Sequence, residues 1–212
     1  MSFFNPENLE KAQVLIGLYP DKRSALIPLC HLAQGQHGHL SNEAMEQIAD
    51  LLEIQPAEVL GTASFYDMLH TEEVGKYLVG VCTNVACMLG GGIELLEHAS
   101  DVLGVPLGGT TEDGMFTLEE VECVAHCDKA PCAQVNYRFF GPLANGDFDQ
   151  LLDDLRNDRL SESVPPHGVL SRVFRDAPAM VPLEIIHRER RAMDDEKKAR
   201  QAALNKDAGG NQ

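Results

Sequence analysis

The chain has 212 residues, of which 44% are hydrophobic and 24% charged, a composition typical of a globular protein with one large or two small domains. Its formal net charge is −16, and residues 1–160 carry this excess, with 25 acidic and 8 basic side chains. Because an acidic surface repels phosphate backbones, the composition argues against a nucleic-acid partner.

The sequence also argues against a place inside a membrane or outside the cell. It contains no run of about 18 apolar residues, the length that a membrane-spanning helix needs. The first residues lack the basic and apolar regions of a secretory signal. We therefore expect no membrane span and a cytoplasmic location.

Residues 1–72 are predicted to form a small bundle of helices. Apolar residues recur at helical spacing in four segments, and short connections separate them. Ser41 can cap the third helix, and Pro56 can open the fourth. The predicted helices are Leu9–Leu18, Ser24–Gln36, Ser41–Leu52 and Pro56–Phe65.

Residues 73–160 show a different pattern, which predicts a second domain of the α/β class. Short strand-like runs alternate here with helical periodicity, an order that fits a small layered α/β fold. The expected strands are Tyr77–Val81, Phe116–Val121, Ala133–Val135 and Tyr137–Phe140, with the last two paired as a hairpin. The expected helices are Met88–Leu103 and Phe148–Leu155.

Residues 161–212 are predicted to be a linker and a charged tail, helical or disordered. The stretch 161–168 has linker composition, and Leu183–Asn205 mixes acidic and basic residues densely enough for one solvated helix. Its apolar stripe is broken, so we expect few core contacts and little effect of truncation after Leu160.

Four of the six cysteines form two close pairs. Cys82 and Cys87 follow the first predicted strand in a C-x4-C pair, and Cys123 and Cys127 follow the second in a C-x3-C pair. Four thiolates brought together by a fold bind zinc or an iron–sulfur cluster, since thiolate is a soft ligand. Spacing alone favours a metal site over disulfides but leaves the choice between iron–sulfur and zinc open.

Residues beside these pairs have more ordinary interpretations. Cys30 is interpreted as a buried small hydrophobe on a helix face. His126 could replace a thiolate as in Rieske centres, but those need two histidines, so we assign it to the surface or to the surroundings of the ligands. Gly90, Gly91 and Gly92 fit no nucleotide motif and could let the backbone approach a cluster and donate amide hydrogen bonds to sulfur.

The residues around the cysteines resemble those of the thioredoxin-like [2Fe-2S] ferredoxins, and in particular the 24-kDa subunit of respiratory NADH–quinone oxidoreductase (complex I). The resemblance covers Asn8 to Arg159 and includes Val-Cys82-Thr-Asn-Val-Ala-Cys87-Met-Leu-Gly-Gly-Gly and Glu-Cys123-Val-Ala-His-Cys127-Asp-Lys-Ala-Pro. It also includes the segment Ala63-Ser-Phe-Tyr66, whose aromatic pair could touch a partner's flavin but is more simply explained by packing. Ala125 stands where the family usually has glycine, which raises a question about the local backbone angle.

The resemblance implies a thioredoxin-like α/β domain behind an amino-terminal helical bundle, and a function in electron transfer. It places one [2Fe-2S] cluster on Cys82, Cys87, Cys123 and Cys127. Cys132 follows Cys127 by five residues and could serve as an alternative ligand, but the family pattern does not include it. The resemblance also implies a neighbouring subunit that binds FMN and NADH, other subunits of the peripheral arm, quinone as the final acceptor, and attachment to the cytoplasmic face of a membrane complex.

Two alternatives to this function stay open at this point. A related subunit serves NAD-linked hydrogenases and formate dehydrogenases, which the sequence does not separate from complex I. The chain could also be a zinc-stabilised adaptor in which the four cysteines only hold the loops. No flavin or nicotinamide motif is present, so we expect the isolated chain to carry electrons without oxidising NADH itself.

Overall fold

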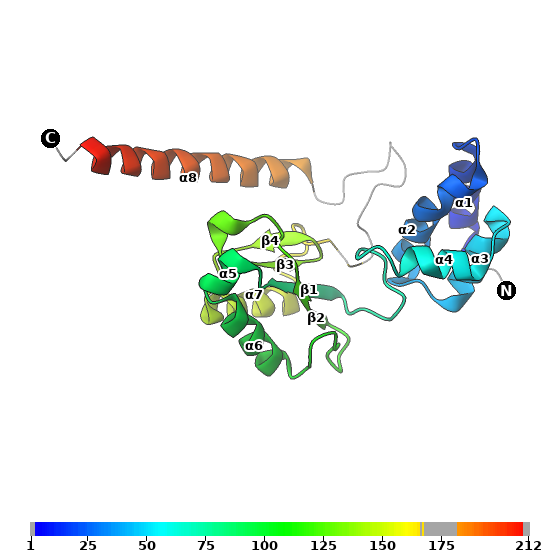
Figure 1. Cartoon of the computed structure of the whole chain (residues 1–212), viewed down its shortest axis with the longest axis horizontal. Helices are drawn as coiled ribbons and strands as arrows, with labels where there is room; N and C mark the ends of the chain where they lie inside the picture. Colours follow the sequence, from blue (N-terminus) through cyan, green and yellow to red (C-terminus); the bar gives the residue numbers. More distant parts are fainter. Residues whose placement is uncertain (1–2, 166, 168–181, 210–212) are drawn as a thin grey trace.

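The structure is a computed structural model, and it describes residues 3–165, 167 and 182–209. It contains a bundle of helices at the amino-terminal end and a sheet with helices in the middle of the chain, and a long helix follows toward the carboxyl terminus (Figure 1). The predicted α/β class with a helical bundle in front of it is confirmed. The domain boundaries at residues 72 and 160 stay predictions.

The amino-terminal bundle consists of helices α1 (Pro6–Gly17), α2 (Leu26–His37), α3 (Asn42–Leu52) and α4 (Pro56–Ala63), with a short 3-10 turn, η1 (Lys22–Ala25), before α2. Capping explains where they begin. The side chains of Asn5 and Ser41 accept hydrogen bonds from backbone amides in the first turns of α1 and α3, and prolines open α1 and α4. Apolar side chains of all four helices form one hydrophobic core, which includes Leu15, Leu29, Ile48 and Val59.

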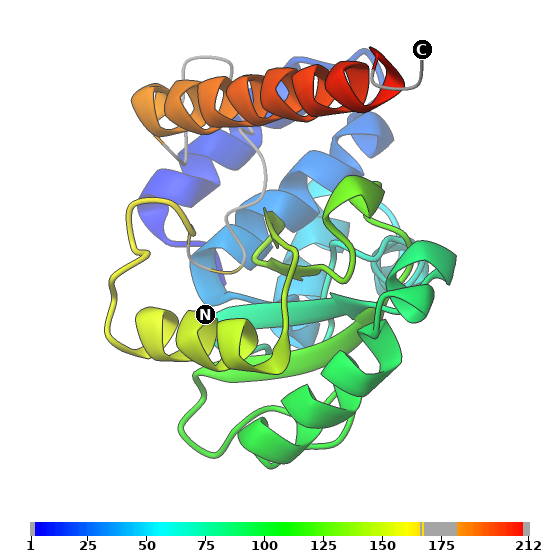
Figure 2. The ribbon, with the colours of Figure 1, turned by 90° about the vertical axis from the view of Figure 1, so that its left-hand side faces the viewer.

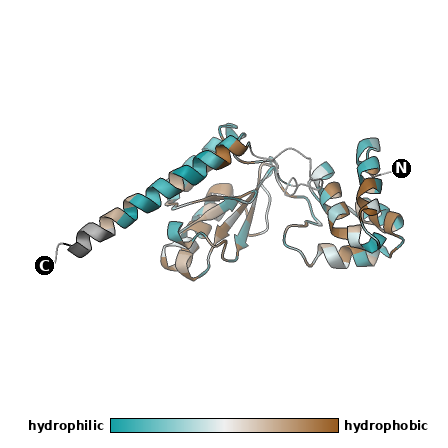
Figure 3. Cartoon of the chain, turned by 90° about the horizontal axis from the view of Figure 1, so that it is seen from above, coloured by the Kyte–Doolittle hydropathy of each residue, from teal (hydrophilic) through white to brown (hydrophobic). Residues whose placement is uncertain are grey.

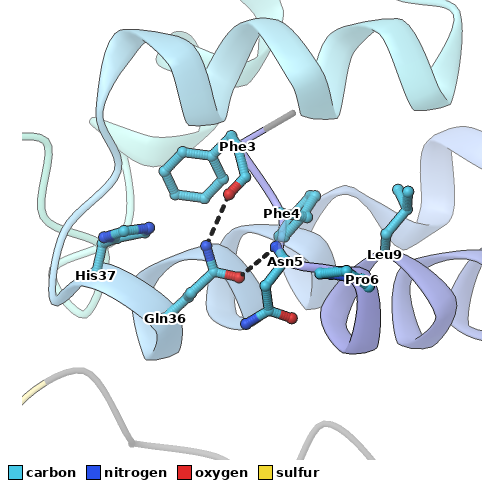
Figure 4. Close-up of a pocket in the computed structure, with 7 residues that line it drawn as sticks. All are labelled: Phe3, Phe4, Asn5, Pro6, Leu9, Gln36 and His37. Carbon is cyan, nitrogen blue, oxygen red and sulfur yellow. Dashed lines mark hydrogen bonds between the residues drawn. The ribbon is translucent and has the colours of Figure 1, made fainter. Parts of the chain in front are cut away.

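The histidines of the His37-Gly-His39 segment belong to a turn. Gly38 ends α2 in the left-handed region, with φ of 82°, a conformation that favours glycine. The ring of His37 packs against Phe3, with 4.8 Å between the ring centres. A pocket lies beside it, where the Gln36 side chain donates to the carbonyl of Phe3 and accepts from the amide of Asn5 (Figure 4). These bonds tie the start of the chain to α2.

The second unit is built on a four-stranded sheet with the order β2-β1-β3-β4. Strand β1 (Tyr77–Cys82) pairs in parallel with β2 (Phe116–Val121) and antiparallel with β3 (Ala133–Val135), which forms a hairpin with β4 (Arg138–Phe140). Asn136 and Tyr137 form the turn of this hairpin, both with positive φ, as a two-residue type I′ turn requires. This explains why β4 begins one residue later than predicted.

One face of the sheet is covered by helices α6 (Gly92–Leu103) and α7 (Asn145–Arg156), whose apolar residues share one core with the strands. Helix α6 lies below the sheet in both ribbon views (Figures 1 and 2). Alternate residues of β1, namely Tyr77, Val79 and Val81, face these helices, as expected for a strand with a period of two. Together with Leu95, Leu118, Phe148 and other apolar residues, they form the second hydrophobic core.

The predicted helix Met88–Leu103 is wrong in its start and its continuity. The structure has two helices here, α5 (Val85–Leu89) and α6, separated by Gly90 and Gly91. Gly91 has a φ of 97°, which helical backbone does not adopt. At Gly92 a Cβ would lie 2.7 Å from the carbonyl oxygen of Cys82 and 2.9 Å from the backbone of Cys87, so only glycine fits.

Of the interpretation of residues 161–212 as a linker and a charged tail, helical or disordered, only the expectation of few core contacts needs correction, while residues 166, 168–181 and 210–212 lie outside the described residues. Val164 is buried in the core of the second unit, and the carbonyl of Pro165 accepts a hydrogen bond from the Asn136 side chain. Helix α8 (Leu183–Gly209) continues beyond the predicted end, and Ile185 near its start is buried. Most of α8 is polar, and it lies on the side of the sheet opposite α6 and α7 (Figures 2 and 3).

Candidate metal centre

All four candidate ligands follow the carboxyl ends of two parallel strands. Cys82 is the last residue of β1, and Cys87 lies on the short helix α5 that follows. Cys123 comes two residues after β2, and Cys127 begins the 3-10 turn η2 (Cys127–Lys129). Because the carboxyl ends of parallel strands meet at one edge of a sheet, both cysteine loops lie at that edge. The cysteine sulfurs that lie within 4.8 Å of one another are those of Cys82, Cys87 and Cys132, and this group does not include Cys123 or Cys127.

Hydrogen bonds join the two cysteine loops directly. The Asn84 side chain, which also caps α5, donates to the carboxylate of Glu122 over 3.1 Å. The backbone amides of Asn84 and Val124 both interact with the sulfur of Cys82 in the sense that favours its thiolate. Since Val124 adjoins Cys123, the loop of the second pair reaches the first ligand of the first pair.

The two pairs differ in their exposure to solvent. Cys82 and Cys87 are 2% and 1% exposed, whereas Cys123 and Cys127 are exposed. The sulfur atoms of Cys123 and Cys127 lie 3.6 Å apart. Burial raises the pKa of the Cys82 thiol, and hydrogen bonding to Cys123 raises the pKa of the Cys127 thiol. Both shifts disfavour the thiolate form of the cysteine. A bound metal ion would favour the thiolate and so lower both pKa values.

Sequence reasoning missed the position of a fifth cysteine. Cys132, just before β3, is 1% exposed, and its sulfur lies 3.5 Å from that of Cys87. The sulfur atoms of Cys82, Cys87 and Cys132 all lie within 4.8 Å of one another. The spacing of five residues after Cys127 was the only signal in the sequence, and it does not reveal this contact. Cys30 lies far from the site in the sequence and is buried in α2, as predicted.

Ala125 and His126 occupy the loop between the ligands of the second pair. Ala125 has a φ of 59°, so the alanine adopts the left-handed conformation that glycine would adopt with less strain. The ring of His126 stacks on Phe139, with 5.8 Å between ring centres and 27° between ring planes. His126 therefore supports the loop from outside the ligand set, as expected.

Two expectations about neighbouring segments need correction. The amides of Gly90 and Gly91 donate to the carbonyls of Ala86, Cys87 and Met88, and thus stay within the helical turn. The aromatic pair at the end of α4 is not explained by packing, because Phe65 is 77% exposed and Tyr66 39%. The two rings contact each other edge to face, with 5.2 Å between their centres.

The donor set fits an iron–sulfur cluster. It offers cysteine sulfurs on two loops joined by the Asn84–Glu122 hydrogen bond, backbone amides that favour the Cys82 thiolate, and partly buried apolar neighbours that include Val121, Val124 and Ala130. Thiolate ligands, amide donors and partial burial are the features that hold such clusters and tune them.

Comparison with known proteins agrees with this geometry. The family model of the thioredoxin-like [2Fe-2S] ferredoxins matches residues 12–156. The chain belongs to this family. Its members carry a [2Fe-2S] cluster, and the cysteine group described here is compatible with it.

Several relatives of the family share more than a third of their aligned residues with this chain. The chain is 44% identical to a subunit of NADH-quinone oxidoreductase from Mycobacterium tuberculosis over 164 residues, which are 77% of this chain and 64% of the relative. It is 39% identical to the corresponding NADH-quinone oxidoreductase subunit of Rickettsia felis, over 73% of this chain and 95% of the relative. It is 38% identical to the mitochondrial "NADH dehydrogenase [ubiquinone] flavoprotein 2" of Dictyostelium discoideum, over 76% of this chain and 67% of the relative.

A solved structure shows the same fold. A chain of a NAD+-reducing [NiFe]-hydrogenase in the air-oxidized state matches with a TM-score of 0.57 and 23% identity. The match covers 63% of the chain described here and 23% of the hydrogenase chain. At this identity the similarity concerns the fold only.

Proposed function

We propose that this protein is the electron-transfer subunit of an NADH:quinone oxidoreductase, in which Cys82, Cys87, Cys123 and Cys127 hold one [2Fe-2S] cluster. The observation that carries the proposal is the meeting of the two cysteine loops, through Asn84, Glu122 and Val124, at the carboxyl ends of β1 and β2. When bound there, the cluster would supply one-electron redox chemistry.

The side chains around the ligands suit a carrier that passes electrons to a partner. Cys82 and Cys87 lie on the buried side, and Cys123 and Cys127 lie at the surface, so a docked redox centre can approach the second pair. The carboxylates of Glu120, Glu122 and Asp128 add negative charge close to the ligands, which disfavours an added electron and lowers the potential of the site.

Partners and location follow from the named relatives. We propose that a subunit with FMN and an NADH site lies next to this chain, with other peripheral-arm subunits around it and quinone as the final acceptor. Within the described residues no helix is long and apolar enough to span a membrane. Attachment to the cytoplasmic face of a membrane complex would therefore come through partner subunits.

The choice of NADH:quinone oxidoreductase over a hydrogenase rests on sequence identity. The relatives named as NADH dehydrogenase subunits are 38–44% identical, whereas the hydrogenase chain shares the fold at 23%. Identity at the higher level favours a shared parent complex as well as a shared fold.

The proposal can be tested by asking which reductants reach the site. The purified full-length chain is mixed anaerobically with NADH and then with dithionite, and electron paramagnetic resonance follows the cluster. We expect no signal with NADH alone and a rhombic signal of about one electron per chain after dithionite. Adding the proposed flavin-binding subunit should make NADH effective. Reduction by NADH without that partner would place a nicotinamide site on this chain and refute the carrier role.

A further inference from the structure

Cys132 is brought to the site by the pairing of β1 with β3. Val81 of β1 lies opposite Ala133 of β3, and the amide of Cys82 donates to the carbonyl of Cys132 over 3.1 Å. This antiparallel register fixes Cys132 beside the first ligand. Its position is therefore set by the backbone of the sheet and does not depend on a flexible loop.

The sulfur of Cys132 lies 3.5 Å from that of Cys87 and within 4.8 Å of that of Cys82. The side chains of Cys87 and Cys132 are both 1% exposed, and the residues packed around them are apolar. Water has no access to replace this contact.

The chemistry of a bound cluster decides which sulfur is the donor. A cysteine that ligates iron is a thiolate, which accepts hydrogen bonds and has no proton to give. If Cys132 were also a thiolate, its buried charge would be desolvated, and the charge of Cys87 at 3.5 Å would repel it. Cys132 therefore keeps its proton, and the sulfur of Cys87 is an acceptor within hydrogen-bonding distance of it.

We propose that Cys132 is a fifth cysteine of the centre that does not ligate iron but donates an S–H hydrogen bond to the Cys87 thiolate. The inference rests on the proposed ligand set. A donor on a ligand sulfur offsets part of the negative charge that arrives with an electron, so it raises the midpoint potential. One electron enters the cluster, the S–H bond of Cys132 stays intact, and no proton is transferred.

The test compares Cys132→Ala and Cys132→Ser with the full-length chain and with Cys30→Ala as the matched control. Cys30 is likewise a buried free cysteine, but it lies in the hydrophobic core of the amino-terminal bundle. Iron content, the electron paramagnetic resonance spectrum and the midpoint potential are measured for each protein under anaerobic conditions. We expect the same iron content in all four proteins. The potential should shift negatively in Cys132→Ala and return toward that of the unmodified chain in Cys132→Ser, because serine keeps a donor.

A second measurement looks for the donated proton itself. The full-length chain is reconstituted in D2O and reduced with dithionite, and electron nuclear double resonance should then detect an exchangeable deuteron coupled to the cluster. Backbone amides near the cluster also exchange, so the test is the loss of one such coupling in Cys132→Ala and its presence in Cys30→Ala.

Three results would overturn the inference. Unchanged potentials with a full cluster in both Cys132 variants would show that this thiol only fills space. Loss of iron from Cys132→Ala, with iron retained in a variant of one of the four proposed ligands, would show that Cys132 is itself a ligand. A full-length chain without iron after reconstitution would instead refute the proposed cofactor, and the inference with it.

Discussion

Burial separates the cysteines of the site into an inner and an outer group. Cys82, Cys87 and Cys132 are each no more than 2% exposed, whereas Cys123 and Cys127 face the surface. The sulfurs of Cys87 and Cys132 lie 3.5 Å apart, and nearby backbone amides favour the thiolate of Cys82. The outer sulfurs are open to a partner. Tuning of the potential and exchange of electrons are thus assigned to different residues of one site.

A second residue-scale feature is the pair formed by His70 and His167. Their ring centres lie 4.7 Å apart, and His70 also contacts the hydroxyl of Tyr137 over 3.4 Å. Burial, and then the neighbouring His70, lower the pKa of His167 to about 4. The pair joins the segment between α4 and β1 to the residues that follow α7, so its protonation affects the packing of distant parts of the chain.

We predict that acid destabilises the protein through His167. The unfolded chain binds a proton at this residue near pH 6.5, but the folded chain binds it only near pH 4. The contribution of His167 to the free energy of unfolding should therefore be fully present above pH 6.5. It should decrease as the pH drops toward 4, by up to roughly 3 kcal/mol. Urea unfolding at pH 7.0 and pH 4.5 measures the loss. His167→Gln should show a smaller loss than the unchanged chain, and equal losses in the two proteins would contradict the assignment.

At the scale of the elements, the break between α5 and α6 positions the first cysteine pair. Gly92 begins α6 in contact with the backbone of both Cys82 and Cys87, so the helix start and the ligand loop determine each other. A side chain at this position would push the two ligands away from the sheet.

Gly92→Ala should therefore destabilise the fold by about 1–3 kcal/mol and reduce the amount of cluster bound. Gly61 provides the matched control, because it lies in helix α4 and a Cβ added there would meet no other part of the chain within 4 Å. Gly61→Ala should stabilise the protein by roughly 0.5–1 kcal/mol, since alanine favours the helix. Thermal unfolding and visible absorption measure both effects. Equal stability of the two variants would show that the close backbone contacts at Gly92 do not affect the stability of the fold.

Local patterns predicted most of the elements but not the contacts between them. The strand at Tyr77–Cys82 and the cap at Ser41 depend on neighbouring residues, and both were predicted correctly within one residue. The break at Gly91 was missed because apolar spacing continues across it. The contact of Cys132 with Cys87 depends on the register of β1 against β3, which residues distant in the sequence determine. The burial of Val164 is non-local in the same way.

At the scale of the whole molecule, the carboxyl-terminal part is tied to the domain that holds the cysteines. Lys129 of η2 pairs with Glu196, and Arg138 of β4 pairs with Glu189, both acidic residues being on α8. Lys129 lies two residues after Cys127, so α8 contacts the loop of the outer ligands. These ion pairs are partly exposed and contribute little stability on their own.

Truncation separates the contribution of Val164 from that of α8. A chain ending at Leu160 loses the buried Val164 and the carbonyl of Pro165 that accepts from Asn136, whereas a chain ending at His167 keeps both. Both truncated chains lack α8. We expect the shorter chain to be less stable by roughly 2 kcal/mol, the value of burying a valine side chain. Similar melting temperatures of the two truncated chains would show that residues 161–167 do not support the core.

The central claim is that Cys82, Cys87, Cys123 and Cys127 hold one [2Fe-2S] cluster, and its most direct test is metal and sulfide analysis of the anaerobically purified full-length chain. Each of the four is replaced by serine, with Cys30→Ser as the control, and every protein is examined for iron, acid-labile sulfide and its dithionite-reduced electron paramagnetic resonance spectrum. The account predicts equal amounts of iron and sulfide and a rhombic signal in the unchanged chain and in the control. The four ligand variants should show a lost or strongly altered cluster. Zinc without sulfide in the unchanged chain, or an unaltered spectrum in any one of the four variants, would contradict the account.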